Sequence, residues 1–371
     1  MGEIARSPRF TELPSSAPLR LISVLALAGA LAGCGSAAMV ASDPPPPPNP
    51  ISSVVPSATG MPNSVTVFGG YEFVSVQGAG LIATYAVNSS SQKPAATYAT
   101  PCMNPSGMVA TTIGTANVLA AVCFDGGAIV TLTIAADGSL HPLGVVYGLS
   151  EPYPEIALDG TDLYVPLFGS GPANGGVAKI NLANPAAPAI SGTVTLASPA
   201  PGQHVNAVSL AASGGYIYVA SGSETQPLAS SSSVQVINES AMALVGTPFI
   251  VPHSPQQIVV AGGVAYVTLF DQLAVEAIDI SNPAAIRSIA TASLANCHPI
   301  PVVVSNNVAY IGCYAEGAVA RLNVANPAQI ATMAAISGVQ STQGMAISGN
   351  ILLVTDASPG GALYSINLSG L

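Results

Sequence analysis

Three of the four histidines in this chain share one local setting: each stands shortly before a run of β-branched residues, where a loop would enter a strand. They are His204, His253 and His298, and Glu155 holds a similar place earlier in the chain. Three imidazoles and a carboxylate on one surface can bind a divalent metal ion, and a single imidazole can act as a general base. Because loop residues are polar in general, a polar recognition surface explains the same set, and we prefer that interpretation.

Other polar and aromatic residues occupy the same setting. The candidate binding residues are Tyr153, Glu155, His204, Asn206, His253, Gln257, His298 and Gln343. The usual short signatures of catalysis are absent from the sequence: there is no G-x-S-x-G, H-E-x-x-H, Walker loop or C-x-x-C. We therefore expect no cofactor, and we assign no catalytic or metal-binding residue.

The elements that must position these residues form a repeat. The stretch VAYVTLFDQLAVEAIDISNPAAI (264–286) is followed 44 residues later by VAYIGCYAEGAVARLNVANPAQI (308–330). Each copy has two alternating runs, typical of short antiparallel strands, and then Asn-Pro, where proline lacks the amide donor that a strand needs. Taking one residue from each run as a marker gives seven pairs: Phe73/Tyr85, Ala120/Leu132, Tyr164/Ile180, Tyr218/Ile237, Tyr266/Ile278, Tyr310/Leu322 and Leu353/Ile366.

The first markers are 47, 44, 54, 48, 44 and 43 residues apart. A period of this size with several short strands and no helical pattern predicts an all-β, seven-bladed β-propeller of four-stranded antiparallel blades over residues 51–371. A stacked β-solenoid is the alternative, although its rungs are usually shorter. In a propeller the loops that enter the inner strands surround the central channel, which would bring the candidate residues to one rim. The turns at the other end read TIGTAN, AASGG, AGG and SNN and look featureless.

The repeat resembles that of a known family. The pattern at 265–286, and LYVPLF followed by VAKINLANPAAP at 163–188, is similar to the LVIVD repeat of bacterial exported propellers. IVTLTIAADGSLHPLG (129–144) is similar instead to YVTN-type, lactonase-like seven-bladed propellers. The resemblance covers about residues 60–371 and concerns strand and turn residues, so it implies a fold and not a reaction.

The N-terminal region predicts export and a lipid anchor. Three arginines precede the apolar run LISVLALAGALAG (21–33), which is too short to span a bilayer, so residues 1–33 indicate a signal peptide. Leu31-Ala32-Gly33-Cys34 resembles a bacterial lipobox, in which the cysteine is acylated; ordinary cleavage beside an unmodified Cys34 is the alternative. Residues 34–50, with DPPPPPNP, indicate an extended tether. We expect attachment to membrane lipid in the cell envelope, at the outer membrane if the source has one.

Two structural predictions follow from the repeat. The last repeat stops at Leu371 without an outer strand, so we expect 51–58 to close the ring by pairing with 362–368. In an exported protein disulfides are permitted, and we expect Cys102–Cys123 and Cys297–Cys313, because each pair joins an entry loop to the second strand of the same blade. Free buried cysteines are the alternative.

The charge balance excludes one class of partner. Removing residues 1–33 leaves 15 acids and four bases, Lys93, Lys179, Arg287 and Arg321, a formal charge of −11. Nucleic-acid binding needs a basic surface, so the association of some YVTN-type propellers with DNA is not carried over. Lys179 and Arg321 hold equivalent positions, and we expect both to be exposed strand charges.

Together these observations predict a lipid-anchored propeller that acts as a binding or scaffolding module for a small molecule or a protein partner. The alternative is a lactonase-like or metal-assisted hydrolase that uses the His and Glu residues of the channel mouth, which the similarity of residues 129–144 supports.

Overall fold

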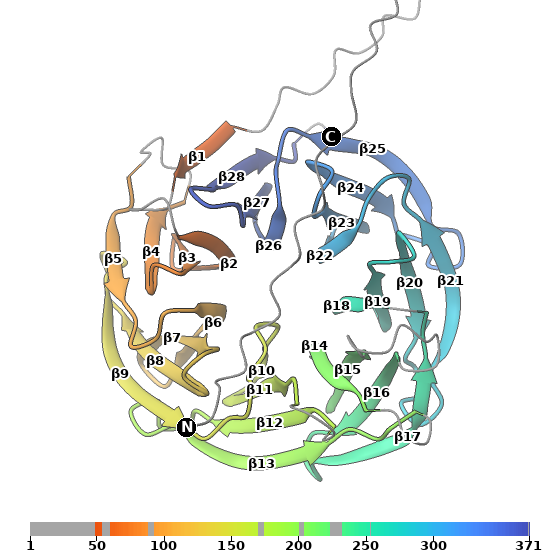
Figure 1. The fold of residues 1–371 in the computed structure, drawn as a ribbon, viewed down its shortest axis with the longest axis horizontal. Helices are drawn as coiled ribbons and strands as arrows, with labels where there is room; N and C mark the ends of the chain where they lie inside the picture. The colour runs from red at the N-terminus through yellow and green to blue at the C-terminus, as the bar shows by residue number, and fades with distance from the viewer. Residues whose placement is uncertain are drawn as a thin grey trace, which may run out of the picture. The chain divides into compact units, whose positions relative to one another are not determined.

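A computed structural model describes residues 49–53, 60–87, 93–169, 174–199, 204–222, 232–252, 254–369 and 371. Its described part contains 28 β-strands and no helix, arranged as seven four-stranded antiparallel sheets around a central axis (Figure 1). The predicted seven-bladed propeller is confirmed. The two alternating runs of each repeat are the two middle strands of its blade. In every blade the first marker residue lies in the second strand from the axis and the second marker residue in the third strand.

The strands of each blade follow one another in the chain from the axis outward. Blade 1 contains β2 (Met61–Phe68), β3 (Tyr71–Gln77), β4 (Leu81–Ala86) and β5 (Ala96–Ala99), and blade 2 contains β6 (Pro105–Ile113), β7 (Ala116–Cys123), β8 (Ala128–Ile134) and β9 (Leu140–Tyr147). Blade 3 contains β10 (Ala157–Asp159), β11 (Asp162–Leu167), β12 (Gly176–Asn181) and β13 (Ala189–Thr195), and blade 4 contains β14 (Asn206–Ser213), β15 (Tyr216–Gly222), β16 (Ser233–Asn238) and β17 (Ala243–Ile250). Blade 5 contains β18 (Pro255–Ala261), β19 (Val264–Leu269), β20 (Ala274–Asp279) and β21 (Arg287–Ser293), and blade 6 contains β22 (Pro299–Ser305), β23 (Val308–Cys313), β24 (Ala318–Asn323) and β25 (Ala331–Ser337).

Blade 7 joins the two ends of the propeller. It contains β26 (Thr342–Ser348), β27 (Ile351–Asp356), β28 (Ala362–Asn367) and, as its outer strand, β1 (Asn49–Ser53). β1 pairs antiparallel with β28, from Asn49 opposite Ser365 to Ser53 opposite Ala362. The strand begins at Asn49, within the segment assigned to the tether, while residues 54–58 of the expected closing strand lie outside the described residues.

The Asn-Pro motif ends the third strands through side-chain hydrogen bonds as well as through proline. In blade 5, Asp279 Oδ1 accepts from Ser281 N at 2.9 Å and Asn282 Oδ1 accepts from Ala284 N at 3.2 Å. The same two turns recur in blades 3 and 6. Asn and Asp side chains bond to the backbone two residues ahead, which turns the chain from the third strand to the outer one.

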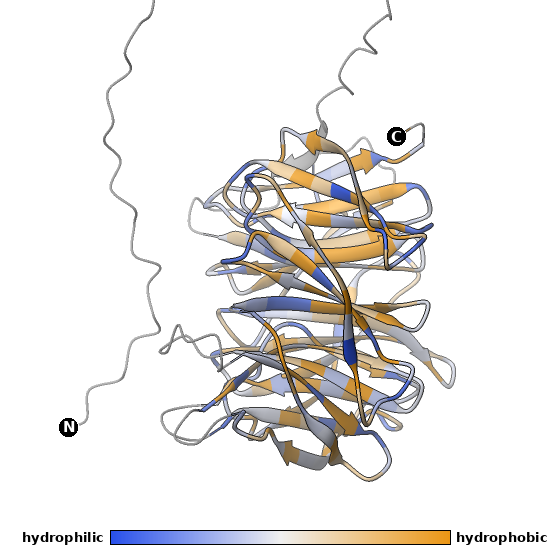
Figure 2. Ribbon diagram, turned by 90° about the vertical axis from the view of Figure 1, so that its right-hand side faces the viewer, coloured by the Kyte–Doolittle hydropathy of each residue, from blue (hydrophilic) through white to orange (hydrophobic). Residues whose placement is uncertain are grey.

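The hydrophobic core lies between the blades. Each of the seven interfaces between neighbouring blades has its own cluster of buried side chains, including the interface of blades 7 and 1, where Val74 and Tyr85 meet Leu353 and Leu363. Hydrophobic residues accordingly dominate the strands (Figure 2). Strands buried on both faces need apolar residues throughout, which explains the Ala- and Val-rich runs of the sequence.

Hydroxyl groups on second strands link neighbouring inner strands. Thr355 Oγ1 accepts from Gly344 N at 2.8 Å and donates to Asn63 O of blade 1 at 2.8 Å. Thr268 Oγ1 does the same between Gln257 N and Ile300 O, at 2.9 and 3.0 Å. These bonds satisfy backbone groups that β-bulges in the inner strands release from the ladders.

The expectation for the two strand cations is wrong. Arg321 is 5% exposed and lies in the interface between blades 6 and 7, where its Nη1 donates to Ala334 O at 3.3 Å. The Lys179 side chain is 18% exposed and forms an ion pair with Asp162 at 2.8 Å. The neighbouring blade covers Arg321, whereas Lys179 is partly buried and keeps some exposure at the far face.

Candidate functional site

The loops that enter the inner strands and the turns between second and third strands lie at one end of the channel, because neighbouring strands are antiparallel. We call this end the mouth and the opposite end the far face. In five blades the first residue after the second strand donates its N–H to a carbonyl of the entry loop of that blade. The pairs are Phe124–Asn104, Phe168–Glu151, Phe270–Ser254, Tyr314–His298 and Ala357–Ser341, at 2.9 to 3.3 Å.

Four of these five positions carry an aromatic side chain, which the sequence analysis missed. Phe124, Phe168, Phe270 and Tyr314 each stand four residues after the first marker of their blade, and all four are partly buried. Tyr153 joins two of them: its ring stacks on Phe168 with centroids 5.2 Å apart and meets Phe124 at 6.5 Å and 72°. The constant offset from the marker was the signal in the sequence that would have found them.

Carboxylates near these aromatic residues hold the entry loops. Asp125 accepts hydrogen bonds from Met103 N and Asn104 N at 3.2 and 3.3 Å. Asp271 accepts from Ser254 Oγ. Glu316 accepts from the backbone N of His298 at 3.1 Å. An acid one or two residues after the aromatic residue therefore serves the same bracing purpose in blades 2, 5 and 6.

Both predicted disulfides are present and brace the same loops. Cys102 is bonded to Cys123 with Cα atoms 5.7 Å apart, and Cys297 to Cys313 with Cα atoms 4.7 Å apart. Each bond ties an entry loop to the end of the second strand, in blades 2 and 6. The mouth is therefore fixed covalently at two places and by hydrogen bonds at others.

Glu155 and Gln257 meet beside the inner strand of blade 4. Gln257 Nε2 donates to Glu155 Oε2 at 2.6 Å, and Gln257 Oε1 accepts from the backbone N of Val302. Glu155 lies before β10 of blade 3 and forms a bridge with Ser209 of β14, which places it beside blade 4 and within reach of Gln257 in blade 5. The pair thus links the entry loop of blade 3 with blades 5 and 6.

The carboxyl group of Glu155 can hold or release a proton near neutral pH. Burial raises the pKa of Glu155 from 4.5 to about 7, and the hydrogen bond from Gln257 opposes this rise. The side chain is partly accessible to solvent, but it lies in a narrow channel and is surrounded by protein, so desolvation outweighs the hydrogen bond.

His298 forms a second pair at the mouth. Its Nδ1 lies 2.5 Å from Glu316 Oε1, its ring is 4.9 Å from that of Phe270, and its side chain is 42% exposed. Although burial acts in the opposite direction, the hydrogen bonds from His298 lower the pKa of Glu316, so the carboxylate stays charged.

The structure does not gather the other predicted residues with these pairs. His204 lies in the loop before β14, partly exposed, and Gln343 lies in the bulge of β26. Asn206 is 5% exposed, and its Oδ1 makes no hydrogen bond within the described residues. His253 and Cys34 lie outside them. No group of three His, Cys, Asp or Glu in the described part is placed to hold a metal ion.

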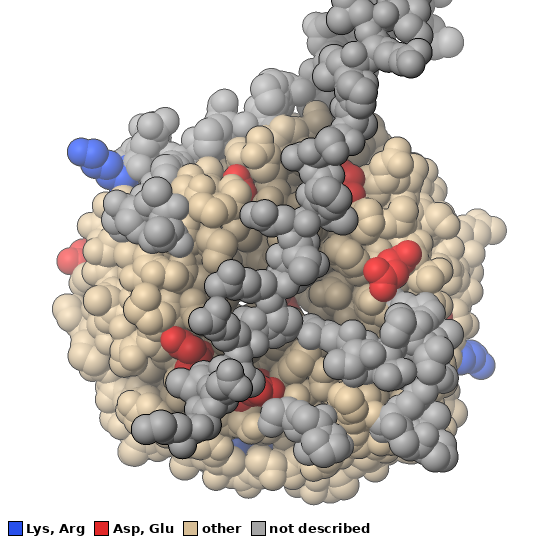
Figure 3. Space-filling model, in the orientation of Figure 1, with Lys and Arg blue, Asp and Glu red and all other residues tan. Residues whose placement is uncertain are grey.

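All four bases lie toward the far face, whereas carboxylates lie at both ends of the propeller, with Asp137, Asp159, Asp162, Glu239 and Asp279 at the far face. Six described carboxylates lie at the mouth: Asp125, Glu151, Glu155, Asp271, Glu316 and Asp356. The bases Lys93, Lys179, Arg287 and Arg321 all lie toward the far face, in turns between third and outer strands or next to them. Figure 3 shows acidic side chains around the central opening and basic ones only toward the edge. The mouth therefore carries a negative potential.

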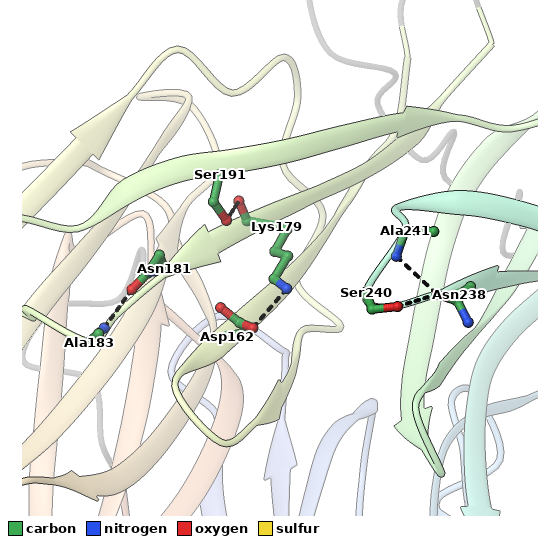
Figure 4. A network of polar contacts seen from close by, with 8 residues as sticks. All are labelled: Asp162, Lys179, Asn181, Ala183, Ser191, Asn238, Ser240 and Ala241. Carbon is green, nitrogen blue, oxygen red and sulfur yellow. Dashed lines mark hydrogen bonds and ion pairs between the residues drawn. The ribbon is translucent and has the colours of Figure 1, made fainter.

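The far face has a hollow of its own, contrary to the featureless turns expected there. An open hollow of about 400 Å³ lies between blades 3 and 4 and is lined by Asp162, Tyr164, Lys179, Tyr216 and Glu239. Figure 4 shows the Lys179–Asp162 pair beside the turn that begins at Asn238. Burial, and next the charge of Asp159, raise the pKa of Glu239 to about 7.

Similarity to known proteins agrees with this architecture. Residues 59–83, 206–224 and 254–289 match the LVIVD repeat. This is the repeat that the sequence resembles. No curated protein matches the chain significantly. Among the described residues, no helix is long and apolar enough to cross a membrane.

Solved structures share the fold at low identity. A catalytically inactive virginiamycin B lyase from Staphylococcus aureus with quinupristin has a TM-score of 0.61 at 14% identity, over 85% of this chain and 97% of its own. The periplasmic gluconolactonase of Pseudomonas aeruginosa has a TM-score of 0.58 at 16% identity, and the match covers 83% of this chain and 99% of that protein. A computationally designed protein has a TM-score of 0.58 at 10% identity, and the match covers 85% of this chain and 99% of that protein. Since a designed protein matches as well as the enzymes, these similarities establish the fold and not a reaction.

Proposed function

We propose that this protein is a binding module of the cell envelope, anchored by a lipid on Cys34, that takes up a ligand at the mouth of its channel. The observation that carries the proposal is the recurrence of an aromatic side chain at one equivalent position in four blades, on loops braced by carboxylates and disulfides. Aromatic surface with few fixed polar groups on a rigid frame is the usual composition of a ligand site.

Rigidity favours binding over a purely structural role. A mouth fixed before the ligand arrives loses little conformational entropy on binding. Tyr153 and Phe168 also pack against the core between blades 4 and 5, and the part of their rings that stays exposed at the mouth is available to a ligand. The pair formed by Glu155 and Gln257 adds polar side chains to the site.

The proposal is tested by screening small molecules for those that raise the melting temperature of the purified chain. We expect the effect of such ligands to disappear in the double variant Tyr153→Leu/Phe270→Leu. It should persist in Tyr216→Leu, a matched change on the far face. The proposal fails if no ligand stabilises the chain, or if the ligands act equally on the mouth variant or lose their effect in the far-face variant.

A hydrolase is the second candidate, and the Glu155 carboxyl group supports it. A group with a pKa of about 7 can act as a general acid or base at neutral pH, and lactonase-like propellers share the fold. Hydrolysis of gluconolactone by the purified chain, lost in Glu155→Gln, would support this candidate. A rate equal to that of the buffer would eliminate lactonase activity on that substrate.

A further inference from the structure

Phe124, Tyr153 and Phe168 form one aromatic cluster at the mouth, on loops of blades 2 and 3. Tyr153 is nearly parallel to Phe168, at 20°, and Phe124 is turned by 72° against it. Tyr153 and Phe168 stack on each other and pack against the buried core between blades 4 and 5, so part of each ring is left exposed at the mouth. The rings come from three separate connections, β7–β8, β9–β10 and β11–β12, and each is partly exposed.

Carboxylates flank this cluster in the sequence and therefore in space. Asp125 directly follows Phe124, while Glu151 and Glu155 stand two residues on either side of Tyr153. Two residues span at most about 7 Å along the chain. Backbone hydrogen bonds keep Asp125 in place, Glu151 is exposed, and no described Lys or Arg lies at the mouth.

We infer that this cluster, which we call the Tyr153 cluster, binds the ammonium group of an organic cation. Aromatic faces attract a cation within about 6 Å of the ring centre, and the flanking carboxylates add a negative potential that no nearby base cancels. An anionic ligand would be repelled by the negative ring faces and by the carboxylates. The inference rests on the proposed function and names the class of ligand.

The test compares choline with 3,3-dimethylbutanol, which has the same shape without the charge. Both are titrated into the purified chain and followed by ligand NMR. We expect choline to bind about tenfold or more tightly than the neutral alcohol. Tyr153→Leu should lose that preference and Tyr153→Phe should keep it, because only the second variant retains a ring.

Two further variants separate the effect of the Glu151 charge on binding from effects that any substitution in the chain would have. Glu151→Gln should weaken choline binding a few-fold and leave the alcohol unchanged, because the exposed carboxylate acts through its charge. Tyr216→Leu, on the far face, should change neither.

Equal binding of choline and the alcohol, lost in Tyr153→Leu, would overturn the cation inference and support the proposed function. No binding of choline, or choline binding that Tyr153→Leu leaves intact, would also overturn the inference. These last two results do not decide the proposed function, because its screen is not limited to cations.

Discussion

Replacing Glu72 by Gln should make the protein more stable at pH 8 and change little at pH 5. Glu72 lies in β3 between Val67 and Tyr85 of the adjacent strands and is 0% exposed. Neither oxygen of its carboxyl group has a hydrogen-bond partner within the described residues. Burial raises the pKa of Glu72 from 4.5 to about 7, because a charged carboxylate without a partner is costly in the interior.

The rise in pKa fixes the sign and size of the effect. Since one pKa unit corresponds to about 1.36 kcal/mol, a rise from 4.5 to about 7 corresponds to about 3 kcal/mol. Between these pH values the folded protein binds more protons than the unfolded chain, so stability falls as the pH rises. The folded protein has lost the full stability contribution of about 3 kcal/mol above pH 7. The amide introduced by Glu72→Gln does not titrate, so the variant lacks this contribution.

The assay is calorimetric unfolding of both proteins at pH 5 and pH 8. For a propeller of this size, about 3 kcal/mol corresponds to a melting temperature about 4 °C higher for Glu72→Gln at pH 8. Some pH dependence will remain, because burial also raises the pKa of Glu155, Glu239 and Glu276. Glu151→Gln, at an exposed site, is the control. If the melting temperatures of wild type and Glu72→Gln differ equally at both pH values, Glu72 is not a buried titrating group and the reasoning fails.

Three further predictions concern covalent and hydrogen-bonded links. Replacing Cys297 and Cys313 by Ala should lower stability by about 3 kcal/mol, the value for a loop of this length, in urea unfolding; a variant as stable as wild type would contradict it. Thr355→Val should cost about 1–3 kcal/mol, because Gly344 N and Asn63 O lose their partner between blades 7 and 1; an unchanged melting temperature would show that water replaces the hydroxyl. Cys34→Ala should move the protein from the membrane fraction to the soluble fraction of cells, and continued membrane association would refute the lipid anchor.

The fold was predictable because it repeats. Seven copies of one alternating pattern place the marker residues in equivalent strands. One wrongly assigned repeat would have given a spacing between first markers outside the observed 43 to 54 residues. The disulfides followed from the same register, since Cys123 and Cys313 stand at equivalent positions. Local pattern was sufficient for both.

Contacts between blades were not predictable in this way. Glu155 and Gln257 are 102 residues apart and meet because Glu155 lies beside the inner strand of blade 4, within reach of blade 5. Lys179 and Arg321 were expected to be exposed because period-2 alternation shows which face a strand residue takes but not what covers that face. In a propeller both faces of each middle strand are covered by neighbouring blades, so a charge there is buried or paired.

The mouth shows how one position can serve both the fold and recognition. The residue after the second strand closes its blade through its backbone N–H, which leaves the side chain free to vary. Four blades place an aromatic ring there and blade 7 places Ala357, with the same hydrogen bond. In blade 4 the residue at the same offset from the first marker is Gly222, the last residue of β15, where an added Cβ would lie 3.3 Å from Pro255 of the next blade. The rings therefore lie in blades 2, 3, 5 and 6, on two sides of the mouth.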